Sequence, residues 1–176
     1  MISSKEIMEL VVQRYDQAVM NNVIRAEYVE CMIVLALGPE WQLTGTWDSW
    51  DCEHKPSGAR IEIKQSAAVQ NWTQESNDAQ RVPRFDIAPR KRIWPHDRPA
   101  DLYVFAWHGL KKDVDQRDPS QWVFLVVAES NLPPKQKSIS LNRLKAPAKT
   151  CGLSDLPHAV AHKLSIIETL KKDMQS

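Results

Sequence analysis

The stretch that decides the fold reads DCEHKPSGARIEIK and covers residues 51–64. Its centre, Lys55-Pro56-Ser57-Gly58, has the composition of a turn, because proline presets one backbone dihedral and glycine tolerates conformations closed to other residues. After the turn, Ile61 and Ile63 alternate with polar residues, which is the period of a strand with one buried face. The sequence therefore predicts a β-hairpin that turns at residues 55–58.

The hairpin brings charged side chains together on the face opposite the two isoleucines. Glu62 and Lys64 are two residues apart, so they share that face. If the turn is centred on Pro56-Ser57, Asp51 lies directly opposite Glu62, with Cβ atoms roughly 4.5–5.5 Å apart. Two carboxylates at this separation repel each other, and a hard divalent cation such as Mg²⁺ relieves the repulsion.

A carboxylate pair that holds a metal next to a lysine is suited to phosphodiester hydrolysis. The metal lowers the pKa of a bound water, and the Lys64 amine orients or deprotonates that water. Two other interpretations of the same residues stay open. Glu-x-Lys on a strand commonly marks a solvated face, and a slip of the hairpin register makes Asp48 the ligand in place of Asp51.

The segments around the hairpin indicate a mixed α/β architecture. Apolar residues recur at three- and four-residue intervals over the first forty residues, which predicts helix, divided at Asn21-Asn22 and ended by Gly38-Pro39. Strands are expected at 41–47, 50–53, 59–66, 84–88, 101–107 and 121–128, and a closing amphipathic helix at 156–172. The last two strands are nearly continuous apolar runs, so they are expected to be buried on both faces. The sequence predicts one α/β (α+β) domain over residues 1–176, with a mixed sheet flanked by helices.

Six segments of the chain, together with the hairpin, resemble a known superfamily; they are residues 47–51, 60–67, 70–72, 85–89, 100–105 and 137–141. An acid on one strand, Glu-x-Lys on the next and a preceding helix with a further Glu resemble the PD-(D/E)xK nucleases, in particular a bacterial group within that superfamily. The resemblance implies a restriction-endonuclease-like fold, with a nuclease core at about residues 22–130 and a C-terminal strand/helix extension at 131–176. The chain departs from the superfamily pattern at Trp50, which stands where proline often precedes the acid.

The resemblance also implies roles for individual residues. Asp51 and Glu62 would bind Mg²⁺, with Mn²⁺ as a possible substitute, and the backbone carbonyl of Ile63 would assist them. Lys64 would serve the nucleophile, and a helical glutamate would complete the catalytic set as a further metal or orienting contact. Two glutamates, Glu27 and Glu30, lie on nearly one helix face. The superfamily pattern, counted back from the glycine that ends the helix, favours Glu30, and Glu27 is the alternative.

The distribution of charge suits a nucleic-acid partner, and two solvated loops are the alternative interpretation of the same charges. The chain has 23 Lys plus Arg against 22 Asp plus Glu, for a formal net charge of +1. Cations nevertheless cluster between residues 81 and 98, and residues 130–154 contain no acid. These clusters would follow the backbone of a nucleic acid, with DNA favoured. The expected contact residues are Gln65, Gln70, Arg90, Lys91, Arg92 and Lys137. Cleavage of both strands of a duplex would favour a homodimer.

Composition excludes several other classes of protein. The longest apolar runs are too short to span a bilayer, and no signal-peptide pattern opens the chain, so no membrane partner is expected. The three cysteines are odd in number and widely spaced, which favours a reducing compartment and a cytoplasmic location. The five glycines have neither P-loop nor dinucleotide-binding spacing.

One alternative of a different class stays open beside the nuclease. The superfamily includes members that bind without cutting, so the chain could be a catalytically inactive nucleic-acid-binding or protein-interaction module of the same fold. The two alternatives differ in whether Asp51 and Glu62 bind a divalent cation.

Overall fold

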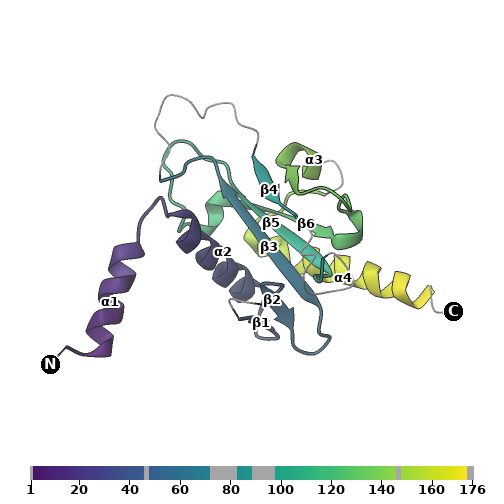
Figure 1. Ribbon diagram of the computed structural model, residues 1–176, viewed down its shortest axis with the longest axis horizontal. Coiled ribbons are helices and arrows are strands. Elements are labelled where there is room, and N and C mark those ends of the chain that lie inside the picture. Colours follow the sequence, from purple (N-terminus) through teal and green to yellow (C-terminus); the bar gives the residue numbers. More distant parts are fainter. Residues whose placement is uncertain (1, 46–47, 72–82, 89–97, 146–147, 174–176) are drawn as a thin grey trace.

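The structure is a computed structural model that describes residues 2–45, 48–71, 83–88, 98–145 and 148–173. Figure 1 shows how its helices and strands are arranged. The helices are α1 (Ser4–Tyr15), α2 (Asn22–Leu37), α3 (Leu141–Lys145) and α4 (Leu156–Asp173). The strands are β1 (Trp41–Leu43), β2 (Cys52–His54), β3 (Arg60–Ala67), β4 (Arg84–Asp86), β5 (Leu102–His108), β6 (Trp122–Ala128) and β7 (Ser138–Ser140). Short 3₁₀ turns lie at Pro119–Gln121, Glu129–Asn131 and Leu153–Asp155.

The two N-terminal helices begin and end at the residues whose chemistry predicts it. The side chain of Asn21 accepts hydrogen bonds from the amides of Val23 and Ile24, so it caps a new helix and confirms the expected break after α1. Gly38 ends α2 with a positive φ of 97°, a conformation that glycine adopts without steric strain. Of the helices that the structure describes, none combines the length and the apolar character needed to cross a membrane.

The strands form one five-stranded sheet in the order β1-β2-β3-β5-β6 and a separate pair, β4-β7. β3 and β5 run parallel, and the other neighbours in the large sheet are antiparallel. A mixed sheet flanked by helices confirms the expected α/β class. The more specific expectation, a restriction-endonuclease-like fold, stays a prediction.

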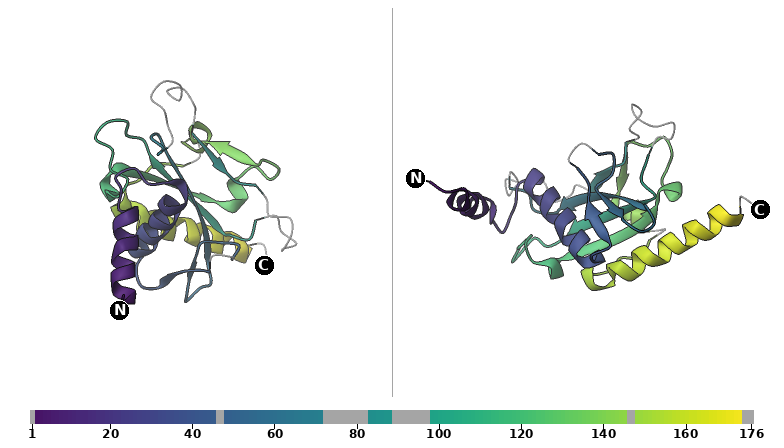
Figure 2. Two further views of the ribbon diagram at one scale, coloured as in Figure 1. Left: turned by 60° about the vertical axis from the view of Figure 1, so that its left-hand side comes forward. Right: turned by 90° about the horizontal axis from the view of Figure 1, so that it is seen from below.

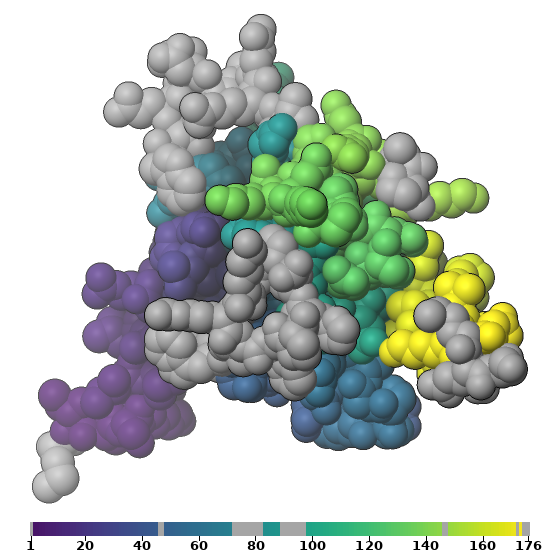
Figure 3. Space-filling model, turned by 45° about the vertical axis from the view of Figure 1, so that its right-hand side comes forward, coloured from purple at the N-terminus to yellow at the C-terminus, as the bar shows by residue number. Residues whose placement is uncertain are grey.

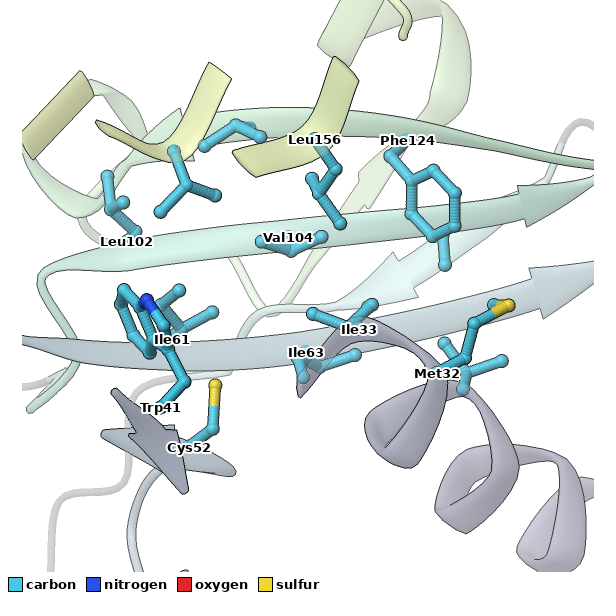
Figure 4. Close-up of a cluster of buried hydrophobic side chains, with 14 of the residues drawn as sticks. Met32, Ile33, Trp41, Cys52, Ile61, Ile63, Leu102, Val104, Phe124 and Leu156 are labelled. Carbon is cyan, nitrogen blue, oxygen red and sulfur yellow. The ribbon is translucent and has the colours of Figure 1, made fainter. Parts of the chain in front are cut away.

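Two hydrophobic layers cover the two faces of the large sheet. On one face, α2 and α4 pack over Ile61, Ile63 and Val104, as Figure 4 shows. On the other face, the β4-β7 pair and α3 pack over β5 and β6, with the rings of Phe85 and Phe105 at 5.1 Å. Both faces of β5 and β6 are therefore buried, as their apolar sequences predict.

The C-terminal segment is built into this core. β7 pairs with β4, and Leu156 and Val160 of α4 are buried in the layer that α2 also covers. The helix α3 was not expected from the sequence, because its five residues are too few to show a helical period. Residues 131–176, expected as an extension of the nuclease core, thus contribute to both hydrophobic layers.

Strands β1 and β2 are shorter than the sequence suggested. β1 ends at Leu43 and β2 begins at Cys52, whereas strand was expected over 41–47 and 50–53. Between them the carboxylate of Asp48 accepts a hydrogen bond from the amide of Gly45, a local turn that competes with ladder pairing. This turn sets the point at which Asp51 enters the hairpin.

Packing of α2 against the sheet can be tested with two residues of the same helix. Ile33 is fully buried in the core and Leu35 is 82% exposed. We expect Ile33→Ala to lower the free energy of unfolding by about 2–5 kcal/mol, because it leaves a cavity between α2 and the sheet. The matched control Leu35→Ala should change it by no more than about 0.5 kcal/mol. Urea denaturation followed by circular dichroism measures both, and equal effects would contradict this packing.

Candidate active site

The hairpin has the register that the sequence predicted. Cys52 pairs with Ile61 and Glu53 pairs with Arg60. The same register, continued by one residue, places Asp51 opposite Glu62. The amide of Asp51 donates to the carbonyl of Ile61 at 3.0 Å. Its carboxylate then turns towards the backbone of β3, where Oδ2 accepts the amide of Ile63 at 2.5 Å. The side chain of Asp51 is therefore held at the edge of β3, in place of a further ladder bond.

The hydrogen bond from Asp51 also orients the backbone of Ile63. In an extended strand the N–H and C=O groups of one residue point to the same side of the strand. Since the amide of Ile63 points to Asp51, its carbonyl lies on the Asp51 side as well. The pairing of β2 with β3 ends at Ile61, so it does not extend to this carbonyl. Asp51 and the Ile63 carbonyl, two of the predicted metal ligands, thus lie along one edge.

Glu62 and Lys64 share the face of β3 opposite Ile61 and Ile63, as predicted. Glu62 is only 3% exposed, and its Oε1 accepts a hydrogen bond from the Lys64 ammonium. A buried carboxylate is costly unless a positive charge neutralises it, which explains why the two side chains pair. The buried carboxylate and the ammonium form a preassembled acid–amine pair.

Glu30 joins this cluster from α2. Its neighbour Val29 is buried in the core, which turns Glu30 to the side of the helix where it is half-buried. Burial, together with the negative charges of Asp51, Glu27 and Glu62, raises the pKa of Glu30 to about 7, and the positive charge of Lys64 partly offsets the rise. These influences show that Glu30, Asp51, Glu62 and Lys64 lie within electrostatic reach of one another.

The two glutamates proposed for the helical position differ in their surroundings. Glu27 is exposed and Glu30 is half-buried, although both line the same hollow of about 140 Å³. The remaining lining residues of this hollow are Leu43, Thr44, Gly45, Asp48 and Asp51. Glu30 is therefore the glutamate that the fold brings deeper into the cluster, and the preference for it over Glu27 in the catalytic set stays a prediction.

Glu62 and Lys64 open into a second, smaller hollow of about 40 Å³. Its other lining residues are Ser49, Asp86, Ile87, Ala88, Arg98, Pro99 and Tyr103. This volume holds a small number of water molecules. The predicted metal pair is therefore divided, because Asp51 lines the larger hollow and Glu62 the smaller one. In the part of the chain that the structure describes, no three His, Cys, Asp or Glu side chains are grouped as metal ligands.

The residues expected to contact nucleic acid have different surroundings. Gln65 accepts a hydrogen bond from the Arg25 guanidinium at 2.6 Å and donates to Asn22, so its amide links β3 to α2. Gln70 donates to the carbonyl of Ala67 at 2.7 Å. Lys137 is exposed immediately before β7. The remaining three, Arg90, Lys91 and Arg92, lie outside the described residues.

Lys137 belongs to a basic lobe formed by β4, β7, α3 and the described residues next to them. Figure 3 shows β7 and α3, in green, on the surface of the molecule. Six exposed cations lie in the lobe: Arg84, Lys135, Lys137, Arg143, Lys145 and Lys149. None of the six forms an ion pair with another residue that the structure describes. Because β4 also lines the small hollow, the basic lobe adjoins Glu62 and Lys64.

Two residues near the site were missed by sequence reasoning. Asp86 of β4 lines the small hollow together with Glu62 and Lys64. β4 belongs to the connection between the neighbouring strands β3 and β5, and the path of this connection brings Asp86 to the hollow. Arg25 is 1% exposed and holds Gln65 and Asn22 with its guanidinium, and burial lowers its pKa to about 10. Arg25 lies four residues before the buried Val29, so helical spacing could have identified its burial.

Comparison of the chain with models of protein families, with curated proteins and with solved structures gave no significant match. The chemistry of the site therefore rests on the positions and charges of its own residues.

The raised pKa of Glu30 predicts a dependence of stability on pH. Between pH 4.5, the ordinary value, and about 7, the folded protein binds more protons at this residue than the unfolded chain. The penalty for burying the charge is therefore absent below this window and complete above it. We expect Glu30→Gln to raise the free energy of unfolding by about 1 kcal/mol above pH 7, after allowance for partial exposure.

Chemical denaturation at pH 4 and pH 8 measures this effect. The matched control is Glu168→Gln on the exposed surface of α4, which should leave the pH profile unchanged. A gain for Glu30→Gln that is equal at both pH values would contradict a buried, negatively charged environment for Glu30.

Proposed function

We propose that the protein is a Mg²⁺-dependent nuclease that hydrolyses phosphodiester bonds of nucleic acid, with DNA as the favoured substrate. The observation that carries this proposal is the electrostatic cluster of Glu30, Asp51, Glu62 and Lys64, drawn from α2, the start of the hairpin and β3. Three acids within electrostatic reach of one another are costly as structure alone. The same arrangement suits a site that binds a cation and a phosphate.

The donor set fits a hard divalent cation. Asp51 and Glu62 would be ligands, the Ile63 carbonyl would assist them, and Glu30 would add a metal or orienting contact; oxygen donors of this kind are those that Mg²⁺ prefers. When bound, Mg²⁺ supplies a water of lowered pKa and an electrophile for the phosphate oxygen. Mn²⁺ would substitute for it.

The residues around the proposed cation would have to change partners. In the structure Glu62 holds Lys64, and Asp51 holds the amide of Ile63. Transfer of Glu62 to a cation would release the Lys64 ammonium next to the reacting phosphate. There the ammonium would orient the attacking water and stabilise the charge that develops on the phosphate, and it would accept a proton from that water only after losing one of its own to solvent. Lys64 would thus neutralise the buried acid in the absence of the cation and act as a catalytic residue in its presence.

The basic lobe supports a polyanionic substrate. It concentrates six exposed cations on a protein whose formal net charge is only +1. Cations grouped next to a phosphate-binding hollow would neutralise several backbone charges, so binding would weaken as salt rises. The protein would act in the cytoplasm, where its three free cysteines stay reduced.

The alternative is a nucleic-acid-binding or protein-interaction module of the same fold that does not turn over substrate. One observation favours it: within the described residues, three metal-ligating side chains do not converge, and Glu62 is already neutralised by Lys64. This alternative predicts no cation binding at Asp51 and no cleavage.

Calorimetric titration with Mn²⁺ separates the two functions. We expect binding by the wild type and at least about tenfold weaker binding by Asp51→Asn, since asparagine keeps a hydrogen-bond acceptor for Ile63 but loses the charge. Asp48→Asn is the matched control, because Asp48 lines the same hollow and is the ligand only if Asp51 is not. Absence of heat with the wild type would favour the inactive module, and loss of binding in Asp48→Asn alone would move the ligand to Asp48.

Lys64→Ala tests the chemistry directly. We expect Mg²⁺-dependent cleavage of plasmid DNA to fall about 100-fold or more, since one charge-stabilising and proton-transferring group is removed. Retention of DNA in a gel-shift assay should be nearly unchanged. The control Lys112→Ala lies in the exposed loop after β5 and should cleave like the wild type. Undiminished cleavage by Lys64→Ala would remove this residue from the mechanism.

A further inference from the structure

The helix α1 presents apolar side chains that the described part of the chain leaves uncovered. None of its residues is buried, and six large apolar side chains range from 38% exposed at Tyr15 to 66% at Leu10. The other four are Ile7, Met8, Val11 and Val12. Figures 1 and 2 show α1 standing away from the sheet. A helix of 12 residues is marginally stable in water unless an apolar face is covered. The exposed apolar side chains of α1 therefore indicate a binding surface.

An apolar groove lies directly beside this helix. It has a volume of about 340 Å³ and opens between α1 and the first part of α2. Its apolar lining comes from Val11, Val12, Tyr15, Met20, Ile24 and Tyr28. A protruding apolar helix and an apolar groove of comparable chemistry therefore lie next to each other on one surface.

Polar contacts at the base of α1 hold the chain that follows the helix against the body of the molecule. Asp16 accepts a hydrogen bond from the Arg117 guanidinium at 2.7 Å. The side-chain oxygen of the buried Gln116 accepts the amide of Met20 at 2.9 Å, and its backbone N–H donates to the carbonyl of Ala18 at 2.7 Å. These bonds fasten residues 16–20 to the loop after β5. The described residues leave the apolar side chains of α1 largely exposed, and we therefore consider a second molecule as their cover.

The charges of α1 indicate which kind of molecule covers the helix. Lys5 and Arg14 balance Glu6 and Glu9, so the helix has no net charge and does not attract nucleic acid or an anionic lipid surface. The N-terminal half carries a net charge of −1 (Lys5, Glu6 and Glu9) and the C-terminal half +1 (Arg14). Two antiparallel copies of α1 therefore bring opposite charges together at both ends, and their helix dipoles also oppose each other favourably.

We propose that α1 and the adjoining groove form the interface of a homodimer, with the two α1 helices antiparallel. A two-fold interface uses the same patch on both molecules, so each helix fills the groove of the other and both apolar surfaces are covered at once. This inference is independent of the proposed nuclease function, although a dimer would carry two copies of the candidate active site.

The mass of the full chain in solution tests the proposal. Light scattering after size exclusion, at tens of micromolar protein, should give twice the 20.2 kDa of one chain. We expect Val12→Glu and, separately, Met8→Glu to weaken dimerisation at least about 100-fold, because each buries a charge in an apolar contact. Both positions are more than half exposed in one molecule, so the folded monomer tolerates them. Leu35→Glu, which alters a still more exposed apolar residue at the far end of α2, should leave the dimer intact.

Charge reversal tests the antiparallel orientation. Glu9→Arg makes both halves of α1 positive and Arg14→Glu makes both negative, so each single variant should dissociate. The double variant restores complementary halves and should dimerise like the wild type. Circular dichroism verifies that the variants keep their helix content.

Three outcomes would overturn the proposal. A wild type that stays monomeric at these concentrations excludes the dimer, and a dimer that survives both Val12→Glu and Met8→Glu places the interface elsewhere. A monomer whose α1 is protected from proteolysis by anionic phospholipid vesicles assigns the helix to a membrane surface instead.

Discussion

The ion pair between Glu62 and Lys64 is the interaction on which the candidate site depends. β3 is the central strand of the large sheet, so a carboxylate on it is removed from water almost completely. Such a group would destabilise the fold unless a cation two residues away neutralised it. In the proposed function, a cation that reached Glu62 would take over this neutralisation and would leave Lys64 available for chemistry.

Elements packed on both faces of the sheet contribute residues to this site. α2 packs on one face through Val29 and Ile33, and this packing brings Glu30 to the edge where Asp51 enters the hairpin. The β4-β7 pair packs on the other face through Phe85, and this packing brings Asp86 and the basic lobe beside Glu62 and Lys64. The acidic hollow and the basic lobe therefore adjoin the same strand from opposite directions. A polyanion that follows the lobe would meet the acidic cluster only where a cation compensates it.

Arg25 shows how strongly the helix and the central strand are coupled. Its buried guanidinium joins Asn22 of α2 to Gln65 of β3 and so fastens the first turn of the helix one position beyond Lys64. Just after the end of β3, the carbonyl of Val69 accepts a hydrogen bond from the side chain of Gln116, which also accepts the amide of Met20 and so ties the chain after α1 to β3. The position of α1 outside the body and the position of Glu30 within the site are thus consequences of neighbouring polar contacts at the start of α2.

Local chemistry in the sequence determined the hairpin, its turn and register, the break at Asn21 and the two apolar strands that became β5 and β6. Each of these depends on residues close together in the chain, and their spacing indicates which face is buried. Tertiary structure alone decided the division of Asp51 and Glu62 between two hollows, because the hydrogen bond to Ile63 competes with the strand ladder. It also decided the approach of Asp86, the use of Gln65 as a structural link and the exposure of α1. The last three of these outcomes depend on crossover connections and on partners far away in sequence, for which the local pattern contains no signal.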